Sequence, residues 1–324
     1  MLDTVPIVEG STAREALANT LDLAQRADRI GYRRYWVPEH HGMPGVAGSA
    51  TSVIIERIAS LTERIRVGSG GVLLPNHSPL VLAEQFGTLE AFHPGRIDLG
   101  LGRALGGRRA VVDRVRPASE RTAKPFEEQL DELLSHFAPA LDGHASAVPA
   151  VGNKPEVWLL GSTEYSARLA GKLGLPYAFA GHLNPGTIDT ALLEYRRAFH
   201  AAHGTATHPQ DILSVPVIAA DTDVRARWLA GSVKLRLLRR SRKERTLLPT
   251  PEEAGAHPFT VEEEQIVRQA MDGYVVGSGD TVLAQLQDLV DKTSCQELMI
   301  TSPIYDHAER CRSYEICARS GPHA

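Results

Sequence analysis

Two groups of residues have the types and spacing that chemistry requires. The first is Glu39-His40-His41, which directly follows an apolar run at residues 35–37. Adjacent side chains on an extended segment point in opposite directions, so one histidine could face a site while its neighbour packs. Imidazole titrates near neutral pH and can act as a general acid or base. A structural, hydrogen-bonded pair of histidines is the alternative interpretation.

The second group is suited to an anion. Gly161-Ser162-Thr163 follows an apolar run and opens a helical pattern, with Ser166 one turn later. The N–H groups of a helix N-terminus together with such hydroxyls can bind a phosphate. Arg103, at the end of another apolar run, could supply the counter-charge. Ser and Thr also cap ordinary helices, which is the alternative for the hydroxyls alone.

Two adjacent glycines lie inside a third apolar run, in Ser69-Gly70-Gly71. Glycine pairs weaken a strand, so their use there must be backbone freedom or the close approach of another group. A flat ring lying against the backbone would explain them, and so would tight packing.

Several other chemistries are not indicated. The sequence has no H-E-x-x-H helix and no third ligand at a zinc-like spacing, so we predict no metal site. It also lacks the G-x-S-x-G elbow of serine hydrolases. Its three cysteines are odd in number and without paired metal spacing, which argues against a disulfide framework: Cys295, Cys311 and Cys317.

Composition narrows the class of protein. The chain has 324 residues, of which 43% are hydrophobic, enough to fill a sizeable core. Its formal charge of −4 argues against nucleic acid as the main partner. No apolar run approaches the roughly 18 residues that span a bilayer, and residues 1–12 do not resemble a signal peptide. We therefore expect a cytoplasmic protein that does not bind membranes.

The elements that must position these residues alternate along the chain. Eight short apolar runs are each followed by a helical pattern, which favours a parallel sheet; they are residues 2–8, 35–37, 65–74, 97–102, 157–160, 177–180, 213–219 and 298–300. Eight such units predict an α/β fold of the (β/α)8 TIM-barrel type rather than a doubly wound sheet. Chemistry in such barrels lies at the carboxyl ends of the strands, where Asn76, His77, His182 and Asn184 also fall.

We interpret residues 1–324 as one domain with a long insertion between strands 7 and 8, at approximately residues 221–280, that could form a lid. The segment 138–155 could be a long loop or a linker, but the alternation resumes unchanged after it. The insertion carries a basic run at residues 234–245. A solvated helix with a narrow apolar face is the simplest interpretation, and a nucleic-acid or membrane patch is the alternative.

Long stretches of the chain resemble a known family. They are Arg34-Tyr35-Trp36-Val37-Pro38-Glu39-His40-His41, residues 67–77, 83–89 and 94–103, Trp158-Leu159-Leu160-Gly161-Ser162, residues 297–300 and Tyr305-Asp306-His307. In this order they resemble the bacterial luciferase-like flavin-dependent monooxygenases, especially the single-chain oxidoreductase branch. The resemblance covers nearly the whole chain.

The resemblance implies a cofactor and a reaction. FMN would bind in its reduced form, FMNH2, at the carboxyl ends of the strands, and a separate flavin reductase would supply it. O2 would react through a C4a-(hydro)peroxyflavin to oxygenate a small-molecule substrate, with His40 assisting as the catalytic residue. The resemblance also implies a homodimer, and a non-proline cis peptide at Gly70–Gly71. The implied cofactor-binding residues are Glu39, Ser69, Gly70, Gly71, Arg103, Leu105, Gly161, Ser162, Thr163 and Ser166.

The sequence departs from the family at one motif. Relatives continue the Gly-Arg pair with Ala-Pro-Gly, whereas this chain has Arg103-Ala104-Leu105-Gly106 followed by Gly107 and two arginines. Substrate identity does not carry over, because the insertion shows little similarity. Two other functions stay open: hydride transfer with the deazaflavin F420, and a non-catalytic flavin-binding protein.

Overall fold

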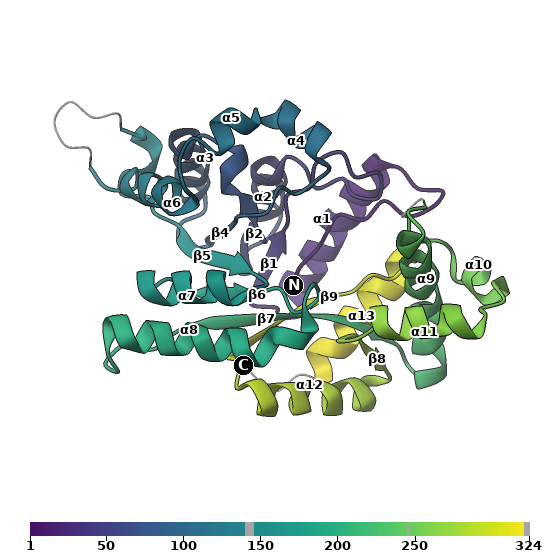
Figure 1. Ribbon diagram of the computed structural model, residues 1–324. Coiled ribbons are helices and arrows are strands. Elements are labelled where there is room, and N and C mark those ends of the chain that lie inside the picture. Colours follow the sequence, from purple (N-terminus) through teal and green to yellow (C-terminus); the bar gives the residue numbers. More distant parts are fainter. Residues whose placement is uncertain (140–145, 245–246, 321–324) are drawn as a thin grey trace.

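Short apolar runs form a parallel sheet that closes into a barrel (Figure 1). The computed structural model describes residues 1–139, 146–244 and 247–320. The strands are β1 (Arg34–Val37), β2 (Arg66–Ser69), β3 (Val72–Leu73), β4 (Ile97–Gly102), β5 (Glu156–Gly161), β6 (Tyr177–Phe179), β7 (Asp211–Ala219), β8 (Val275–Gly277) and β9 (Glu297–Thr301). Neighbours follow the order β1-β2-β4-β5-β6-β7-β9, and every strand pair is parallel. The predicted (β/α)8 barrel is confirmed.

The first residues close the ring between β9 and β1. Leu2 N–H donates to the Ile300 carbonyl over 2.9 Å, and Asp3 N–H donates to the Trp36 carbonyl over 2.9 Å. The expectation of a regular first strand over residues 2–8 is wrong, because this segment makes only isolated bridges. Pro6 has no N–H to donate, and Val5 has a φ of 53°, so the extended conformation cannot continue.

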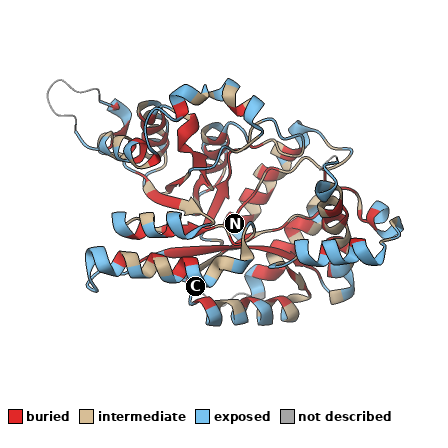
Figure 2. Cartoon of the chain, in the orientation of Figure 1, coloured by how far each residue is buried: buried red, intermediate tan, exposed pale blue. Residues whose placement is uncertain are grey.

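Helices cover the outside of the barrel, and their polar faces remain exposed (Figure 2). They are α1 (Ala13–Arg29), α2 (Thr51–Ser60), α3 (Pro79–Phe92), α4 (Arg109–Val115), α5 (Ala118–Arg121), α6 (Phe126–Ser135), α7 (Glu164–Leu173), α8 (Ile188–His203), α9 (Asp223–Ser241), α10 (Pro251–Ala256), α11 (Val261–Ala270), α12 (Gly279–Thr293) and α13 (His307–Ser320), with short 3-10 turns η1 (Leu74–Asn76), η2 (Val148–Ala150) and η3 (Pro185–Thr187). Among the described residues, no helix is both long and apolar enough to cross a bilayer.

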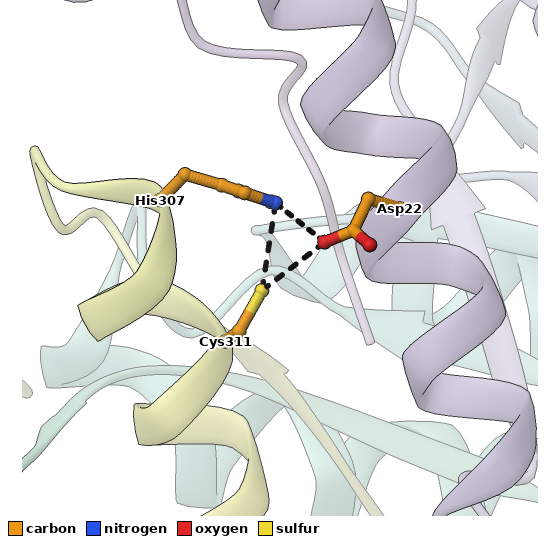
Figure 3. A group of neighbouring side chains, drawn as sticks. All are labelled: Asp22, His307 and Cys311. Carbon is orange, nitrogen blue, oxygen red and sulfur yellow. Dashed lines mark hydrogen bonds and ion pairs between the residues drawn. The ribbon is translucent and has the colours of Figure 1, made fainter.

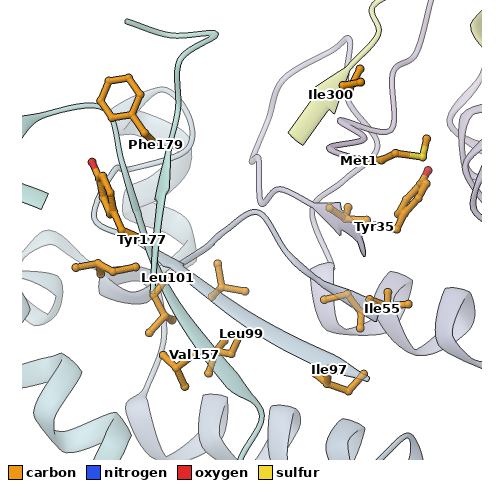
Figure 4. Close-up of a cluster of buried hydrophobic side chains, with 14 of the residues drawn as sticks. Met1, Tyr35, Ile55, Ile97, Leu99, Leu101, Val157, Tyr177, Phe179 and Ile300 are labelled. Carbon is orange, nitrogen blue, oxygen red and sulfur yellow. The ribbon is translucent and has the colours of Figure 1, made fainter. Parts of the chain in front are cut away.

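Alternation along the strands divides the core into two layers. One layer joins strands to helices and contains the side chains of Tyr35, Leu99, Leu101, Val157 and Tyr177 (Figure 4). The other gathers the intervening side chains into a separate cluster; these are Leu2, Trp36, Trp158, Ala178, Ile212 and Met299, with Leu160 packed against them. This second cluster fills the barrel interior.

Two indoles occupy most of that interior. The rings of Trp36 and Trp158 meet edge to face, with centroids 5.6 Å apart. Small residues make the room: a Cβ added at Gly70 would lie 2.7 Å from Leu2 Cδ1, and one at Gly100 would lie 2.1 Å from the Ser69 carbonyl oxygen. Tight packing around the indoles is therefore sufficient to require glycine at Gly70.

A buried charge network lies among the first residues of the strands. Asp98 Oδ2 accepts from Arg34 Nη1 over 2.7 Å and from Trp36 Nε1 over 2.8 Å, and Asp98 Oδ1 accepts from Arg66. Arg34 also donates to Glu297 and lies over the Trp158 ring. Both Arg34 and Asp98 are almost fully buried. Each charge is thus paired and hydrogen-bonded, as burial requires.

The predicted insertion contains α9, α10, α11, β8 and the start of α12, and α9 to α11 group at one side of the barrel (Figure 1). Leu248 bridges Val8 and accepts a hydrogen bond from Glu9 N–H over 3.0 Å, which ties the insertion to the N-terminal segment. Strand β8 was not predicted from the sequence, because it has only three residues. It pairs with residues 217–219, the last part of β7.

Two arginines of the basic run form ion pairs with acidic neighbours. Arg239 pairs with Glu9 and Glu253, and Arg242 pairs with Glu263. One face of α9 is buried against the barrel, including Leu235 and Leu238. The run thus belongs to a helix with a packed apolar face, as the simplest interpretation expected; its last residue, Arg245, lies outside the described residues.

The segment 138–155 lies partly outside the described residues, since positions 140–145 are among those not described. Its described end packs on the barrel helices: a Cβ added at Gly87 of α3 would lie 2.4 Å from the Ala150 backbone.

Candidate functional site

Residues with chemical potential follow the carboxyl ends of neighbouring strands. Glu39, His40 and His41 follow β1, Gly70 and Gly71 follow β2, and Arg103 follows β4. Ser162 and Thr163 follow β5, and His182 follows β6. Because the strands are parallel and form one ring, these ends share one rim of the barrel.

Glu39 is the centre of a buried hydrogen-bond network. Its Oε2 accepts from Leu73 N–H over 2.9 Å and meets His77 Nε2 at 2.8 Å, while its Oε1 meets His41 Nε2 at 2.7 Å. Burial raises the pKa of Glu39, but the hydrogen bonds from His77, Leu73 and His41 outweigh it, so the net pKa is lowered. The carboxylate therefore stays charged, and both of its oxygens form hydrogen bonds with protein groups. Glu39 thereby positions His41, His77 and the backbone at Leu73, and its implied role at the cofactor stays a prediction.

The same network holds the loop that departs from the family motif. Asn76 Nδ2 donates to the Leu105 carbonyl over 3.2 Å, and His41 N–H donates to the Gly106 carbonyl over 2.9 Å. Gly106 has a φ of 70°, and a Cβ there would collide with Leu73. Hydrogen bonds thus fix this loop where relatives use proline. The Leu105 side chain remains exposed on the rim.

His40 follows β1 and has a buried ring nitrogen without a partner in the described parts of the chain. It lies half-buried, and its Nδ1 atom is buried and accepts or donates no hydrogen bond among the described residues. Burial lowers its pKa, so the imidazole is neutral near pH 7. An unpaired buried polar atom is costly, so His40 Nδ1 is a position where a hydrogen bond from water or from a bound molecule would be favourable.

A second histidine approaches His40 from the other side of the rim. His182 Nδ1 meets Ser214 Oγ of β7 at 2.6 Å. Burial first, and the nearby His40 second, lower the pKa of His182 to about 4. The rim therefore carries two adjacent neutral imidazoles, one held by a hydroxyl and one unpaired.

The lowered pKa of His182 predicts a pH dependence of stability. Between pH 6.5 and about 4 the unfolded chain binds a proton at this residue that the folded chain does not. Folding stability must therefore fall as the pH falls through that window. On lowering the pH from 8 to 5 we expect His182 to cost about 2 kcal/mol.

Urea unfolding of wild type and His182→Asn at both pH values checks this. The variant should lose less stability on acidification, and losses of packing or of the Ser214 hydrogen bond cancel because they are present at both pH values. The exposed His203→Asn serves as the control. An unchanged pH dependence in His182→Asn would contradict the prediction.

The N-terminus of α7, which follows β5, lies on the same rim of the barrel. Thr163 is the N-cap residue, but its hydroxyl makes no capping hydrogen bond. Ser166 Oγ lies 3.5 Å from Thr163 Oγ1 and 3.1 Å from the Tyr177 hydroxyl. The Thr163 hydroxyl thus contacts Ser166, and the first N–H groups of α7 receive no hydrogen bond from the N-cap side chain.

Arg103 reaches this helix end from β4. Its guanidinium lies over the ring of Tyr165, in the first turn of α7, at 4.3 Å from the centroid. Arg103 forms no ion pair within the described parts of the chain. A cation held beside a helix N-terminus by an aromatic ring is an arrangement that can bind a phosphate.

The remaining predicted residues contribute mainly backbone. Ser69 is buried, and its Oγ donates to the Gly100 carbonyl over 2.8 Å, so this hydroxyl is not available to a ligand. The peptide between Gly70 and Gly71 is cis, as the resemblance implied. Gly161 leaves space for Ser166, since a Cβ there would lie 2.0 Å from Ser166 Oγ. Asn184 donates to the Ser162 carbonyl over 2.9 Å.

Sequence analysis placed Asn76, His77 and His182 after strands but assigned them no role. The structure brings His77 to Glu39 and His182 to His40. Their position directly after an apolar run is the only local signal. Their partners come from other strands, so spacing could not identify them.

Comparison with known proteins agrees with this arrangement. A family model described as luciferase-like monooxygenase matches residues 3–294. The chain belongs to the luciferase-like monooxygenase family. It is 42% identical to a protein of Escherichia coli (strain K12) called luciferase-like monooxygenase, over 98% of this chain and 94% of that protein.

Two further relatives match this chain over almost their whole length. The chain is 35% identical to the N-acetyl-S-alkylcysteine monooxygenase of Bacillus subtilis (strain 168), over 98% of this chain and 96% of that protein. The crystal structure of apo-MsnO8 superposes with a TM-score of 0.90 at 38% identity, covering 99% of this chain and 97% of the other.

More distant structures share only the fold. The oxygenating constituent of a 3,6-diketocamphane monooxygenase of Pseudomonas putida, in complex with FMN, has a TM-score of 0.74 at 22% identity. An F420-dependent secondary alcohol dehydrogenase has a TM-score of 0.72 at 12% identity. Within this family the chain is thus an oxidoreductase with flavin monooxygenases among its neighbours.

Proposed function

We propose that this chain is the oxygenase of a two-component system. It would take FMNH2 from a separate reductase and use O2 to oxygenate a small organic substrate. The observation that carries the proposal is the rim itself, where His40 Nδ1 is buried without a hydrogen bond from the described residues, and where Arg103 lies beside the N-terminus of α7, whose N-cap side chain makes no capping hydrogen bond. In this family, a histidine nitrogen and a helix N-terminus with an arginine on one rim fit the ring and the phosphate of a flavin nucleotide.

The residues present fit FMN. The 5′-phosphate would lie against the N–H groups of α7, with Thr163, Ser166 and Arg103 around it. The isoalloxazine would lie toward Gly70, Gly71 and His40. When bound, reduced FMN supplies the oxygen-activating chemistry, which side chains cannot perform.

The chain's own residues then hold protons and exclude water. His40 Nδ1 is placed to donate or accept one proton at the flavin, and neutrality near pH 7 allows either role. His182 stays neutral beside it, so no imidazolium charge repels a cationic or proton-donating state of His40. Glu39 holds His41 and His77, and so fixes the backbone on which His40 stands.

Exposed apolar side chains support a substrate with apolar parts. Met43, Leu105, Tyr165 and Leu183 are large, exposed and located in segments that follow β1, β4, β5 and β6. The insertion, at approximately residues 221–280, would cover them as a lid. A relative is named for its action on S-alkylcysteines, so thioethers belong in the first substrate panel.

The phosphate cradle gives a prediction on cofactor affinity. Arg103→Ala should weaken FMN binding by roughly ten- to a hundredfold, because a charge-assisted hydrogen bond of about 1.5–3 kcal/mol is lost. Riboflavin, which lacks the phosphate, should bind both proteins equally.

Fluorescence titration with both flavins measures this, and Arg109→Ala is the matched control. Arg109 is an arginine of the same loop region whose side chain is 80% exposed and pairs weakly with Asp113. Equal loss of FMN and riboflavin affinity in Arg103→Ala would show that Arg103 supports the fold rather than the phosphate.

The function itself is tested in two steps. Anaerobic titrations with FMNH2, FMN and F420 come first, and we expect FMNH2 to bind most tightly; tighter binding of F420 would favour hydride transfer. The protein is then incubated with a flavin reductase, NADH, FMN and 18O2 and a panel of aldehydes, ketones and thioethers. Incorporation of one 18O atom, detected by mass spectrometry, is the expected result. Flavin binding without product from any substrate class would favour the non-catalytic alternative.

Two partner predictions accompany the proposal. Omitting the reductase but supplying photoreduced FMN should preserve product formation, because the reductase only delivers the flavin. Light scattering after size-exclusion chromatography should give the mass of a homodimer. A cytoplasmic location stays a prediction.

A further inference from the structure

A cluster of three possible metal ligands lies in the outer helical layer, away from the strand ends. Asp22 is on α1, while His307 and Cys311 are on α13, the first and last helices of the barrel (Figure 3). The four-residue spacing puts His307 and Cys311 on one face of their helix. Their ligand atoms all lie within 4.8 Å of one another.

The three atoms converge on one point. His307 Nε2 lies 2.8 Å from Asp22 Oδ2, Cys311 Sγ lies 3.6 Å from His307 Nε2, and Cys311 Sγ lies 3.8 Å from Asp22 Oδ2. This is not the arrangement of a nucleophilic triad, in which the two nitrogens of the imidazole serve different partners. Here a single nitrogen faces both the thiol and the carboxylate, as ligands around an ion do.

We propose that Asp22, His307 and Cys311 form a binding site for a borderline-soft divalent cation of the Zn²⁺ class. Tetrahedral Zn²⁺ binds nitrogen and oxygen at about 2.0–2.2 Å and sulfur at about 2.3 Å, so its ligands lie roughly 3.3–3.7 Å apart. The distance of 3.6 Å from Cys311 Sγ to His307 Nε2 lies within this range, and the distance of 3.8 Å from Cys311 Sγ to Asp22 Oδ2 exceeds it by only about 0.1 Å. The His307–Asp22 pair must open by about half an ångström, which a rotation of two partly exposed side chains provides.

The ligand set selects the metal. Thiolate and imidazole favour Zn²⁺ or Co²⁺ over Mg²⁺ and Ca²⁺, which prefer oxygen. On binding, the cation replaces the thiol proton, which leaves to solvent, and Cys311 coordinates as thiolate. Asp22 and His307 keep 42% and 24% of their side chains exposed, so the cation has a path in and a water can complete the fourth position.

Neighbouring charges can accommodate the ion. Asp22 Oδ2 receives all three contacts, from His307, Cys311 and Arg26 Nε, the last at 2.8 Å. Arg26 has a second carboxylate nearby, Glu315, at 3.9 Å. It can shift toward Glu315 or the other oxygen of Asp22 when the ion takes Oδ2. His307 Nδ1 is buried without a partner within the described chain, so the imidazole is not committed elsewhere.

Binding of the cation would connect α1 and α13, the first and last helices of the barrel. α1 follows the segment that closes the ring at Leu2, and α13 follows β9, its neighbour across that closure. The cation would therefore cross-link the seam between the first and last strands. Anything that binds only the folded state stabilises it by mass action.

Co²⁺ is the probe, because a cobalt thiolate absorbs in the near ultraviolet. Chelator-treated protein is titrated with Co²⁺, and we expect a thiolate-to-cobalt band that saturates at one cation per chain, with intense visible bands typical of four-coordination. Zn²⁺ should displace the colour and raise the melting temperature. Surface histidines such as His200 and His203 cannot produce the thiolate band.

Cys311→Ser should abolish the near-ultraviolet band and the thermal shift, while Cys317→Ser, a buried thiol on the same helix, should retain both. Asp22→Asn, at a partly exposed position, provides a second variant should the serine variant fold poorly; it should weaken Co²⁺ binding by at least about tenfold. Absence of the band in wild type, or its persistence in Cys311→Ser, would overturn the proposal and leave a hydrogen-bonded trio.

Discussion

Asp98→Ala should lower the free energy of unfolding by about 3–5 kcal/mol, because it leaves the buried guanidinium of Arg34 without its main counter-ion. Arg34 is 1% exposed, and Asp98 is fully buried. The change also removes acceptors from Trp36 and Arg66. Glu297 remains, but it satisfies only one edge of the guanidinium.

Urea unfolding measures the loss as a lower midpoint with an unchanged slope. Glu309→Ala is the control, since Glu309 forms an ion pair with Arg225 on the exposed surface and should cost less than about 1 kcal/mol. The double variant Arg34→Met/Asp98→Ala should recover part of the stability, because the unpaired buried charge is gone. A loss below about 1 kcal/mol in Asp98→Ala would show that water solvates Arg34.

His40→Ala should slow product formation by at least about a hundredfold, the usual contribution of a positioned acid or base. Its Nδ1 is a buried polar atom without a partner among the described residues, so its removal breaks no hydrogen bond made by that atom. FMNH2 affinity should change little, because the phosphate cradle is on the opposite side. O2 consumption should continue, with hydrogen peroxide replacing the oxygenated product.

The ratio of product to hydrogen peroxide is the decisive readout, because misfolding would lower both. His203→Ala, on the outer surface at the end of α8, should keep the wild-type ratio. If His40→Ala retained the wild-type ratio of product to hydrogen peroxide, the proposed role of His40 in proton transfer would be contradicted. His182 would then be the better candidate for that role.

Structural features that depend on residues close together in the sequence could be predicted from the sequence. The spacing of Thr12 and Glu15 predicts a capping box, and both of its hydrogen bonds are present. The strand runs were identified because parallel strands are buried on both faces and read as continuous apolar segments. The helix start after β5 was also predictable, because Ser162 and Thr163 lie next to it in the sequence; their role in binding a phosphate stays a prediction.

Features that depend on ring closure were not predictable. Glu39 and His77 are 38 residues apart, and only the pairing of β1 with β2 brings them together. Asp22 and His307 are 285 residues apart, so the expectation of no metal site rested on spacings that could not include them. Ser69 was a candidate ligand by position, but its hydroxyl is bonded to Gly100 across the sheet.

The long strand β7 pairs with β9 along one part of its length and with β8 along its last part. Residues 212–216 of β7 pair with β9 inside the ring, and residues 217–219 continue past it to carry β8. The outer part of the insertion, α10 and α11, is attached to α9 partly through ion pairs of Arg239 and Arg242 at the surface. Surface contacts of this kind constrain sequence weakly, whereas strand register constrains it strongly. We therefore expect the segment 247–270 to tolerate exchange between relatives while the strands and the residues at their carboxyl ends stay fixed. A swap of this segment tests whether it sets the preference for substrate.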